Sequence, residues 1–347
     1  MFLNIKNRIE RELNVFIRGL ERNYSLSKLS PVLFSNIKEF ISRDGKRIRP
    51  ILFCIGYLGF SKKAPPGLYR SALSLELLHD FMLVHDDIID KSAMRRGKPS
   101  MHVLLNKYLR GGKNLKFKGD DLAIVIGDVM YAMALDAFLA IREKPKRKEQ
   151  ALRKLISAAL YTGSGEFIEL LLGVKPIEKI TKNDIYKIYA YKTANYTFAS
   201  PLAMGAALAG AKDNQIKKLF DYGMDLGCAF QIKDDIIGTF GEMEKTGKSN
   251  LTDISEAKRT LLIWHAYNHC GNKDKTAIKK VFSGKRAGKK ELLEIRKILS
   301  SADSLNYAQR EIKNLLLKSE RILAAINMRK EYRNALLNFS RKVILGC

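Results

Sequence analysis

The sequence predicts an all-α fold, in which one large helical bundle forms a single domain over residues 1–347. Two observations lead to this prediction. Nearly every long segment repeats its apolar residues with the 3.6-residue period of a helix, and the alternation typical of strands is scarce. No linker is long enough, or low enough in complexity, to mark a domain boundary. Since 46% of the 347 residues are hydrophobic, the chain can bury a large core.

The helices are expected between short breaks that contain glycine, proline or clustered charges, such as 63–67. Their approximate ranges are 2–22, 27–43, 48–59, 67–90, 100–108, 121–141, 148–172, 182–211, 213–240, 255–270, 290–300, 303–326 and 328–344. The run 122–141 is almost wholly apolar, although it contains Asp128 and Asp136. We expect a buried core helix there and no membrane span, because no other segment resembles a span.

The chain carries 62 basic and 36 acidic residues, a formal net charge of +26. Such a surplus attracts nucleic acid, anionic membranes and phosphorylated small molecules. The basic runs at 144–148 and 279–290 lack interleaved aromatic residues, so no nucleic-acid partner is expected. The four cysteines form no C-x-x-C pair, which argues against a zinc site or disulfides and for a reducing, cytoplasmic compartment.

Two acidic clusters, 86–90 (DDIID) and 234–238 (DDIIG), lie inside apolar stretches with helical spacing. Burying carboxylates among apolar residues is costly unless something compensates their charge. Positions i and i+4 share one face of a helix, so Asp86 and Asp90 should point the same way. Mg²⁺ takes a few carboxylate oxygens and fills its other positions with water or phosphate. The clusters therefore predict a cage for several Mg²⁺ ions in an enzyme that handles diphosphates.

Basic residues accompany both clusters at fixed offsets along the chain. They are Arg95-Arg96 after the first cluster, GKRIRP (45–50) upstream, Lys192-Thr193 between the clusters, and Thr246-Gly247-Lys248 after the second. Arginine forks and lysine charges bind phosphate oxygens that a metal does not neutralise. A metal cage beside these cations suits a site for two polyanionic substrates.

These motifs, in this order over residues 40–262, resemble the trans-isoprenyl diphosphate synthases of the polyprenyl synthase family. The resemblance rests on GKRIRP (45–50), VHDDIID with the trailing RRGKP (84–99), KT (192–193), FQIKDDIIGTFGEMEKTGKSNLTDI (230–254) and EAKRTLL (256–262). It implies an isoprenoid synthase bundle with a central cavity. It also implies a Mg²⁺-dependent prenyltransferase of isoprenoid lipid synthesis, which condenses isopentenyl diphosphate with an allylic diphosphate. The family further suggests a homodimer that forms through the apolar helix around 122–141.

The resemblance implies a role for individual residues. The Mg²⁺ ligands would be Asp86, Asp87, Asp90 and Asp234, and Asp235 would either bind the metal through water or support the ligands without touching it. The isopentenyl diphosphate pocket would contain Lys46, Arg49, His79 and Arg96. The allylic diphosphate would contact Arg95, Lys192, Lys248 and Lys258. Thr193 and Gln231 would stabilise the developing carbocation through their lone pairs. The second cluster departs from the common pattern, because Gly238 stands where many members have a third aspartate.

The length of the product is expected to depend on Phe81 and its neighbour Met82. Phe81 precedes Asp86 by five residues, which places it about 7.5 Å further along a helix. A bulky ring there would form the floor of the tunnel that receives the growing chain. The aromatic residue resembles that of archaeal-type geranylgeranyl diphosphate synthases. A fifteen-carbon product, as in a farnesyl diphosphate synthase, or a mixture of products stays open.

Two other functions share parts of this pattern. A class I terpene cyclase has the same bundle and first aspartate motif, but it needs no second substrate pocket. Its second metal motif normally carries Asn or Asp, Ser or Thr, and Glu, which 234–238 lacks. A non-catalytic partner subunit usually loses aspartates, and only one family aspartate is absent here. Both functions stay as alternatives to the prenyltransferase.

Overall fold

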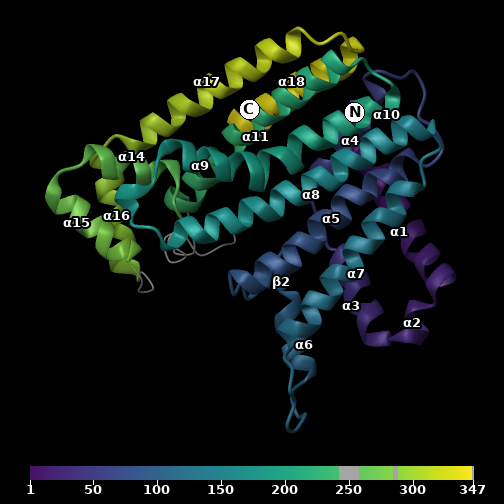
Figure 1. The fold of residues 1–347 in the computed structure, drawn as a ribbon, viewed down its shortest axis with the longest axis horizontal. Helices are drawn as coiled ribbons and strands as arrows, with labels where there is room; N and C mark the ends of the chain where they lie inside the picture. The colour runs from purple at the N-terminus through teal and green to yellow at the C-terminus, as the bar shows by residue number, and fades with distance from the viewer. Residues whose placement is uncertain (242–257, 284–287, 346–347) are drawn as a thin grey trace. The chain divides into compact units, whose positions relative to one another are not determined.

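The computed structural model describes residues 1–241, 258–283 and 288–345. Across these ranges helices dominate, and one two-stranded hairpin is the only sheet (Figure 1). The prediction of an all-α fold is therefore confirmed. The chain divides into two compact units, Met1–Leu152 with Met204–Gly210 and Arg153–Ala203 with Ala211–Cys347. The single domain over 1–347 stays a prediction, as does its central cavity.

The first unit is built around α5, a helix buried on all sides over much of its length. Its helices are α1 (Phe2–Tyr24), α2 (Leu26–Leu29), α3 (Pro31–Ile41), α4 (Ile48–Leu58), α5 (Leu68–Ile89), α6 (Met101–Tyr108), α7 (Gly119–Leu139) and the start of α8 (Pro145–Val174). Every residue from 71 to 78 is buried, and α5 packs against α1, α4 and α7. A helix that is buried on all sides belongs to the protein interior, and the charged side chains it carries need partners there. The first aspartate cluster lies where this interior helix ends.

A helix break and a hairpin differ from the predicted elements of this unit. The expected helix 27–43 is split into α2 and α3 at Ser30 and Pro31. The Ser30 hydroxyl accepts a hydrogen bond from the Leu33 amide at 3.3 Å, and proline suits the first position of a helix. The unpredicted strands β1 (Met94–Arg95) and β2 (Lys98–Pro99) pair antiparallel. A 3.6-residue pattern cannot reveal such short strands.

The hairpin turn sets the backbone of the two arginines that follow the first aspartate cluster. Its two central residues have positive φ, 53° at Arg96 and 73° at Gly97, as a tight two-residue hairpin turn requires. Arg43 holds the hairpin by donating to the carbonyls of Arg95 at 3.1 Å and Pro99 at 2.9 Å. The Glu39 carboxylate in turn fixes the Arg43 guanidinium. The arginines are thus presented by an anchored turn.

The second unit contains the remaining helices of the described residues. They are the rest of α8, η1 (Ile177–Lys179), α9 (Lys182–Ile188), η2 (Tyr189–Ala199), α10 (Ser200–Ala209, shared with the first unit), α11 (Asp213–Phe240), α14 (Leu261–His269), α15 (Asn272–Phe282), α16 (Lys289–Ser301), α17 (Ser304–Ala324) and α18 (Lys330–Leu345). Helix α11 packs against η2 and α17. A Cβ at Gly227 would lie 2.4 Å from the Ala194 Cα, and one at Gly223 would lie 2.5 Å from the Ala199 Cα. These glycines bring α11 and η2 into backbone contact.

The segment η2 corrects the prediction of one regular helix over 182–211. It is an eleven-residue π-helix between α9 and α10. Such helices are rare, usually short, and often found at functional sites. Lys192 and Thr193 lie within it. Apolar spacing does not distinguish a π-helix from an α-helix, so only the packed structure reveals it.

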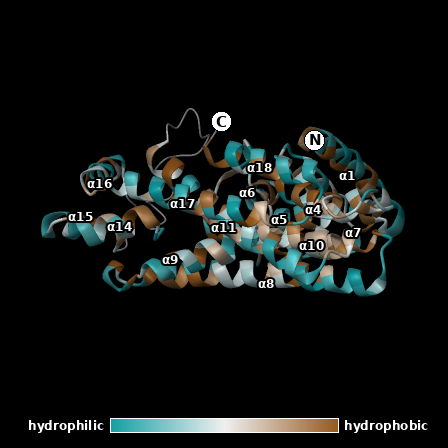
Figure 2. Ribbon diagram, turned by 90° about the horizontal axis from the view of Figure 1, so that it is seen from above, coloured by the Kyte–Doolittle hydropathy of each residue, from teal (hydrophilic) through white to brown (hydrophobic). Residues whose placement is uncertain are grey.

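Within the described part of the chain, two helices, α7 and α8, are by length and composition apolar enough to cross a membrane. The expectation that no segment besides 122–141 resembles a span is therefore wrong. In the most apolar windows, 44% of α7 and 28% of α8 are buried, so α7 buries one face and is not a fully buried core helix. Figure 2 shows the hydrophobic residues of α8 concentrated toward its C-terminal half. Exposed apolar side chains form a stripe along α8, which consists of Ile156, Leu160, Phe167, Leu170 and Val174.

Candidate active site

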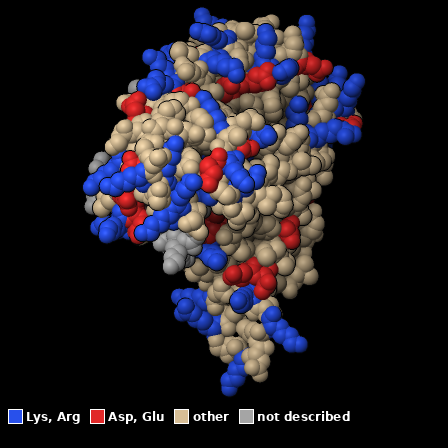
Figure 3. All heavy atoms as spheres, turned by 60° about the vertical axis from the view of Figure 1, so that its left-hand side comes forward, with Lys and Arg blue, Asp and Glu red and all other residues tan. Residues whose placement is uncertain are grey.

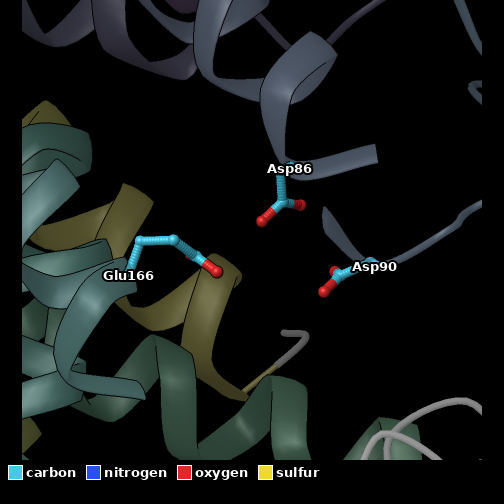
Figure 4. Close-up of side chains that lie close together, drawn as sticks. All are labelled: Asp86, Asp90 and Glu166. Atoms are coloured by element: carbon cyan, nitrogen blue, oxygen red, sulfur yellow. The ribbon is translucent and has the colours of Figure 1, made fainter. Parts of the chain in front are cut away.

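The predicted site residues are distributed over both units, and each half is described in its own unit. In the first unit, Asp86 and Asp90 lie at the end of α5 and are half-buried. Their nearest ligand oxygens lie within 4.8 Å of each other. Figure 4 shows both carboxylates turned toward the same space. The i and i+4 positions thus face together, as the spacing predicts, and the pair suits a hard cation with oxygen ligands.

Asp87 occupies a different environment from its two neighbours in the cluster. Its side chain is fully buried, and the Arg95 Nε donates to its Oδ1 at 2.8 Å. The Arg95 Nη2 also lies 3.5 Å from the Asp86 Oδ2. Burial raises the pKa of Asp87, although Arg95 opposes that shift. Asp87 is thus an internal partner of Arg95, and its predicted role as a metal ligand stays a prediction.

His79 lies within the electrostatic reach of four arginines of the first unit. The pKa of His79 is lowered well below its usual value by burial, and further by the charges of Arg49, Arg96, Arg95 and Arg47. A neutral imidazole among arginines is an environment suited to an anion. Arg49 is half-buried here and Lys46 is exposed. The residues predicted for isopentenyl diphosphate therefore all lie in the first unit, where His79 is close to the charges of Arg49 and Arg96.

Arg47 adds its charge to this group, but its guanidinium is already bonded to protein acceptors. Its guanidinium is buried and donates to Glu76 and to Glu10, both at 2.8 Å. It also donates to the carbonyl of Arg43 at 2.9 Å. These bonds use its donors on protein acceptors, so Arg47 holds α1 and α5 together.

Two buried acids, Glu76 and Asp80, were missed in the sequence. They lie one turn apart on α5 and face Arg96, whose Nη2 is 3.1 Å from the Asp80 Oδ1 and 3.4 Å from the Glu76 Oε1. Burial and the neighbouring Glu76 raise the pKa of Asp80 to about 7. The signal that could have revealed them is an E-x-x-x-D spacing inside an apolar helix. These acids position Arg96 on the inner side of the hairpin.

Phe81 packs against α7 within the first unit. Its ring meets the edge of His85 at 4.6 Å and the ring of Tyr131 at 5.4 Å, measured between centroids. His85 fits because α7 has Gly127 there, where a Cβ would lie 2.4 Å from the His85 Nε2. Both Phe81 and Met82 are half-buried. Phe81 lies on the N-terminal side of the Asp86 and Asp90 pair, and its role in product length stays a prediction.

In the second unit, the two aspartates of the second cluster are unequal. Asp234 is exposed, whereas Asp235 is buried and accepts hydrogen bonds from the Gln231 Nε2 at 3.0 Å and from the Tyr189 hydroxyl. The Thr193 hydroxyl donates to the Gln231 Oε1 at 2.7 Å. Thr193, Gln231 and Asp235 are therefore brought together, as neighbours in one hydrogen-bonded chain. Asp234 is the aspartate of this pair that solvent reaches.

Lys192 is held by two glutamates that were not predicted as site residues. Its Nζ lies 2.5 Å from both the Glu166 Oε2 and the Glu169 Oε2. A Cβ at Gly165 would lie 2.6 Å from the Lys192 amide nitrogen, so this glycine lets α8 touch η2. The acidic pair at 166 and 169 faces one side of α8, which is a spacing that could have been noticed.

The two remaining lysines predicted for the allylic diphosphate are Lys248 and Lys258. Lys258 is half-buried and precedes α14 by three residues. Lys248, with Thr246 and Gly247, lies outside the described residues. Elsewhere the surface charges are mixed, and Figure 3 shows Lys and Arg interleaved with Asp and Glu on the visible face.

Known proteins are similar to this chain in sequence over most of its length. Residues 30–299 match the family model of polyprenyl synthetase. The chain is 31% identical to the geranylgeranyl diphosphate synthase of Sulfolobus acidocaldarius, over 88% of this chain and 87% of that protein. It is 30% identical to the geranylfarnesyl diphosphate synthase of Aeropyrum pernix, over 86% and 90%.

Solved structures are similar over nearly the whole chain. One is the geranylgeranyl pyrophosphate synthase of Corynebacterium glutamicum, complexed with isoprenyl diphosphate and magnesium. It has a TM-score of 0.89 and 25% identity, and the match covers 98% of each chain. The geranylgeranyl pyrophosphate synthetase of Pyrococcus horikoshii shares the fold, with a TM-score of 0.82 at 24% identity over 99% and 97% of the two chains.

Proposed function

Because the chain belongs to the polyprenyl synthetase family, we propose that it is a trans-prenyltransferase that makes geranylgeranyl diphosphate. Its substrates are isopentenyl diphosphate and an allylic diphosphate, namely dimethylallyl, geranyl or farnesyl diphosphate. The observation that carries the proposal is the Asp86 and Asp90 pair, in the same unit as His79 and its arginines. One group suits a metal-bound diphosphate and the other suits a second anion. Relatives of both the geranylgeranyl and the geranylfarnesyl type support this substrate class.

The residues present fit magnesium, because paired carboxylate oxygens are the ligands it prefers. We propose that Asp86, Asp90 and the exposed Asp234 hold several Mg²⁺ ions. Bound Mg²⁺ neutralises the charge that develops on the leaving diphosphate. Arg49, Arg96, His79 and Lys46 hold isopentenyl diphosphate, while Lys192 and Lys258 contact the allylic diphosphate.

The reaction begins when the allylic C–O bond breaks and its electron pair leaves with the diphosphate. The isopentenyl double bond then supplies the electrons of the new C–C bond, and the product cation loses a proton to the released diphosphate. Thr193 donates its hydroxyl hydrogen to Gln231, so its oxygen presents lone pairs elsewhere. Such lone pairs stabilise a carbocation in a site that excludes water.

One assay tests this function against its alternatives. Purified protein is incubated with Mg²⁺, isopentenyl diphosphate and each allylic primer in turn, and the product chain length is read by mass spectrometry. A twenty-carbon diphosphate is expected. A fifteen-carbon endpoint would identify a farnesyl diphosphate synthase, and a cyclic hydrocarbon would identify a terpene cyclase. Turnover only after addition of a second chain would identify a partner subunit.

We expect Phe81→Ala to lengthen the product beyond that of the wild type. The ring packs against His85 and Tyr131, and its removal opens space on the N-terminal side of the Asp86 and Asp90 pair. Each added isoprene unit needs such space, so products of at least about five units are expected. Tyr57→Phe, at a buried aromatic position elsewhere in the unit, is the control. An unchanged product length in Phe81→Ala contradicts this role.

We also propose a homodimer that uses the exposed apolar faces of α7 and α8. On α7 these side chains include Ile124, Val125 and Leu139, and on α8 they form the stripe defined above. Apolar residues repeated every three or four positions suit packing against another helix. Exposed apolar side chains gathered on one helix in this way are typical of a protein–protein contact.

Phe167→Glu is expected to convert the dimer to a monomer, as measured by size-exclusion chromatography with light scattering. Phe167 is 63% exposed at the middle of the α8 stripe, where a buried charge would cost about 2–4 kcal/mol in the dimer. The control is Leu317→Glu, because Leu317 is 44% exposed but lies outside the stripe, on α17. An unchanged mass for Phe167→Glu, or equal dissociation of both variants, argues against this interface.

We place the enzyme in the cytoplasm, without a membrane span and without a nucleic-acid partner. The three cysteines among the described residues are free thiols, and two of these, Cys54 and Cys228, are buried. Free buried thiols are typical of proteins from reducing compartments. Partition of the protein into the soluble fraction of lysed cells, without detergent, tests this proposal.

A further inference from the structure

Tyr189 connects three helices of the second unit through its hydroxyl group. It is the first residue of the π-helix η2, and its side chain is almost wholly buried. The hydroxyl donates to the Asp235 Oδ2 on α11 and accepts from the Leu261 amide of α14 at 2.9 Å. Tyr189 is not among the site residues that the sequence motifs predicted. Its partner Asp235, however, belongs to the second aspartate cluster.

The direction of every hydrogen bond in this chain of groups follows from its chemistry. A backbone amide can only donate, so the Tyr189 oxygen accepts from Leu261 and its own hydrogen goes to Asp235. Asp235 therefore acts as a carboxylate that accepts on both oxygens.

The orientation of the next two groups follows from that of Asp235. The Gln231 amide turns its Nε2 toward the Asp235 Oδ1 at 3.0 Å, which leaves its Oε1 to accept from Thr193 at 2.7 Å. Thr193 consequently directs its hydrogen toward Gln231. A relay Leu261–Tyr189–Asp235–Gln231–Thr193 thus sets which lone pairs Thr193 presents.

The same hydroxyl group also anchors the segment that carries Lys258. Arg259 donates to the carbonyls of Gly173 at 2.9 Å and Lys175 at 3.0 Å. Leu261 is bound to Tyr189, and the Thr260 hydroxyl caps α14 by accepting from the Ile263 amide at 3.4 Å. The residues that follow Lys258 are therefore held on both sides, and Tyr189 supplies one of the two attachments.

We propose that Tyr189 is a positioning residue for the prenyl transfer. Its hydroxyl group orients Asp235, Gln231 and Thr193, and it attaches the start of α14 beside Lys258. This inference rests on the proposed function of these residues. A tyrosine that only filled space would act through its ring, whereas this role depends on the single oxygen.

Tyr189→Phe removes that oxygen and keeps the ring. We expect kcat to fall about 30-fold, with the KM for isopentenyl diphosphate changed by less than about twofold, because no residue assigned to that substrate belongs to the relay. The matched control is Tyr186→Phe, three residues earlier. Its hydroxyl donates to the Glu311 Oε2 at 2.6 Å, so it loses a comparable bond outside the relay. Equal kcat losses in the two variants would overturn the proposal.

A double-mutant cycle separates the relay from a general loss of stability. If Tyr189 acts through Thr193, adding Thr193→Val to Tyr189→Phe should lower kcat by less than about threefold beyond the larger single effect. When Thr193→Val is combined with Tyr186→Phe instead, the fold-losses in kcat of the two single variants should multiply. Multiplication in both cycles overturns the relay. If Tyr189→Phe does not fold, Asp235→Asn is used in its place. The new amide group would place a donor opposite the donor of Tyr189 or of Gln231, and this breaks the same chain of hydrogen bonds. An unchanged kcat in Asp235→Asn contradicts the proposal.

Binding of magnesium and inorganic pyrophosphate, measured by calorimetry, tests the relay independently of product formation. Because the relay attaches the start of α14, Tyr189→Phe should weaken this binding about tenfold, and Tyr186→Phe should change it by less than about twofold. Equal affinities overturn the inference. If wild-type protein binds pyrophosphate but forms no prenyl product with any primer, the proposed function fails, and the comparison of the two variants still decides the relay.

Discussion

Replacing both Asp86 and Asp90 with asparagine is expected to lower kcat at least about 10³-fold, which corresponds to about 4 kcal/mol of lost transition-state stabilisation. The two carboxylates lie within 4.8 Å of each other, so one cation can contact both. An amide oxygen carries no net charge and binds Mg²⁺ more weakly. Product formation is measured over a range of Mg²⁺ concentrations, at saturating isopentenyl and farnesyl diphosphate.

Stability should move in the opposite direction in this double variant. Two carboxylates at i and i+4 repel each other, by about 0.2–0.5 kcal/mol on a helix. Removing the repulsion should keep or raise the free energy of urea-induced unfolding, so lost activity would not reflect unfolding. Asp213→Asn, at an exposed position of α11, is the control and should keep full activity.

The single variants distinguish a ligand from an internal partner. Asp86→Asn should regain part of its activity at high Mg²⁺, because a weakened ligand set is compensated by concentration. Asp87→Asn should not, because Asp87 is fully buried against Arg95, and its loss leaves that arginine without its nearest carboxylate. Equal rescue of both variants would instead identify Asp87 as a ligand.

Asp80→Asn is expected to remove a pH dependence of stability that the wild type shows between about pH 4 and pH 8. The pKa of Asp80 is raised from 3.8 to about 7, so in this window the folded protein keeps a proton that the unfolded chain releases. The stabilising contribution is complete below about pH 4 and is lost as the pH rises through 7. Its full size is as much as about 4 kcal/mol.

The measurement is the free energy of urea-induced unfolding of wild type minus that of Asp80→Asn, at several pH values. Taking the difference cancels His79, whose lowered pKa makes stability rise with pH below its usual range. The difference should fall with pH and level off above about pH 8. Asp213→Asn, at an exposed carboxylate, supplies the control profile. A constant difference from pH 5 to pH 8 would mean that burial does not hold the proton on Asp80.

Several features of the fold follow from periodicity and did not require the structure. The all-α class is confirmed, and α1, α5 and α11 occur close to their predicted ranges. Long amphipathic or apolar segments leave few alternatives to a helix. The hairpin β1–β2 and the break at Pro31 were missed, because a two-residue strand and a single cap carry too little pattern.

The candidate site was predictable wherever a role follows from spacing along one helix. Asp86 and Asp90 face together because i and i+4 share a face. The partners of Arg96 and Lys192 were not predictable in this way. Glu76 and Asp80 lie on α5, whereas their partner Arg96 lies in the turn of the hairpin. Glu166 and Glu169 lie on α8, whereas their partner Lys192 lies on η2. Such pairs depend on how elements pack.

The sequence by itself determined the helical class, the family and the identity of the acidic and basic motifs, because these depend on local spacing and residue type. Tertiary structure decided which member of each aspartate cluster is buried. Asp87 is enclosed with Arg95, and Asp235 is enclosed with Tyr189 and Gln231. Adjacent residues on a helix point about 100° apart, and only the packing of neighbouring elements decides which of the two directions is interior. The physical reason is that burial is a property of the packed chain and is absent from any local pattern.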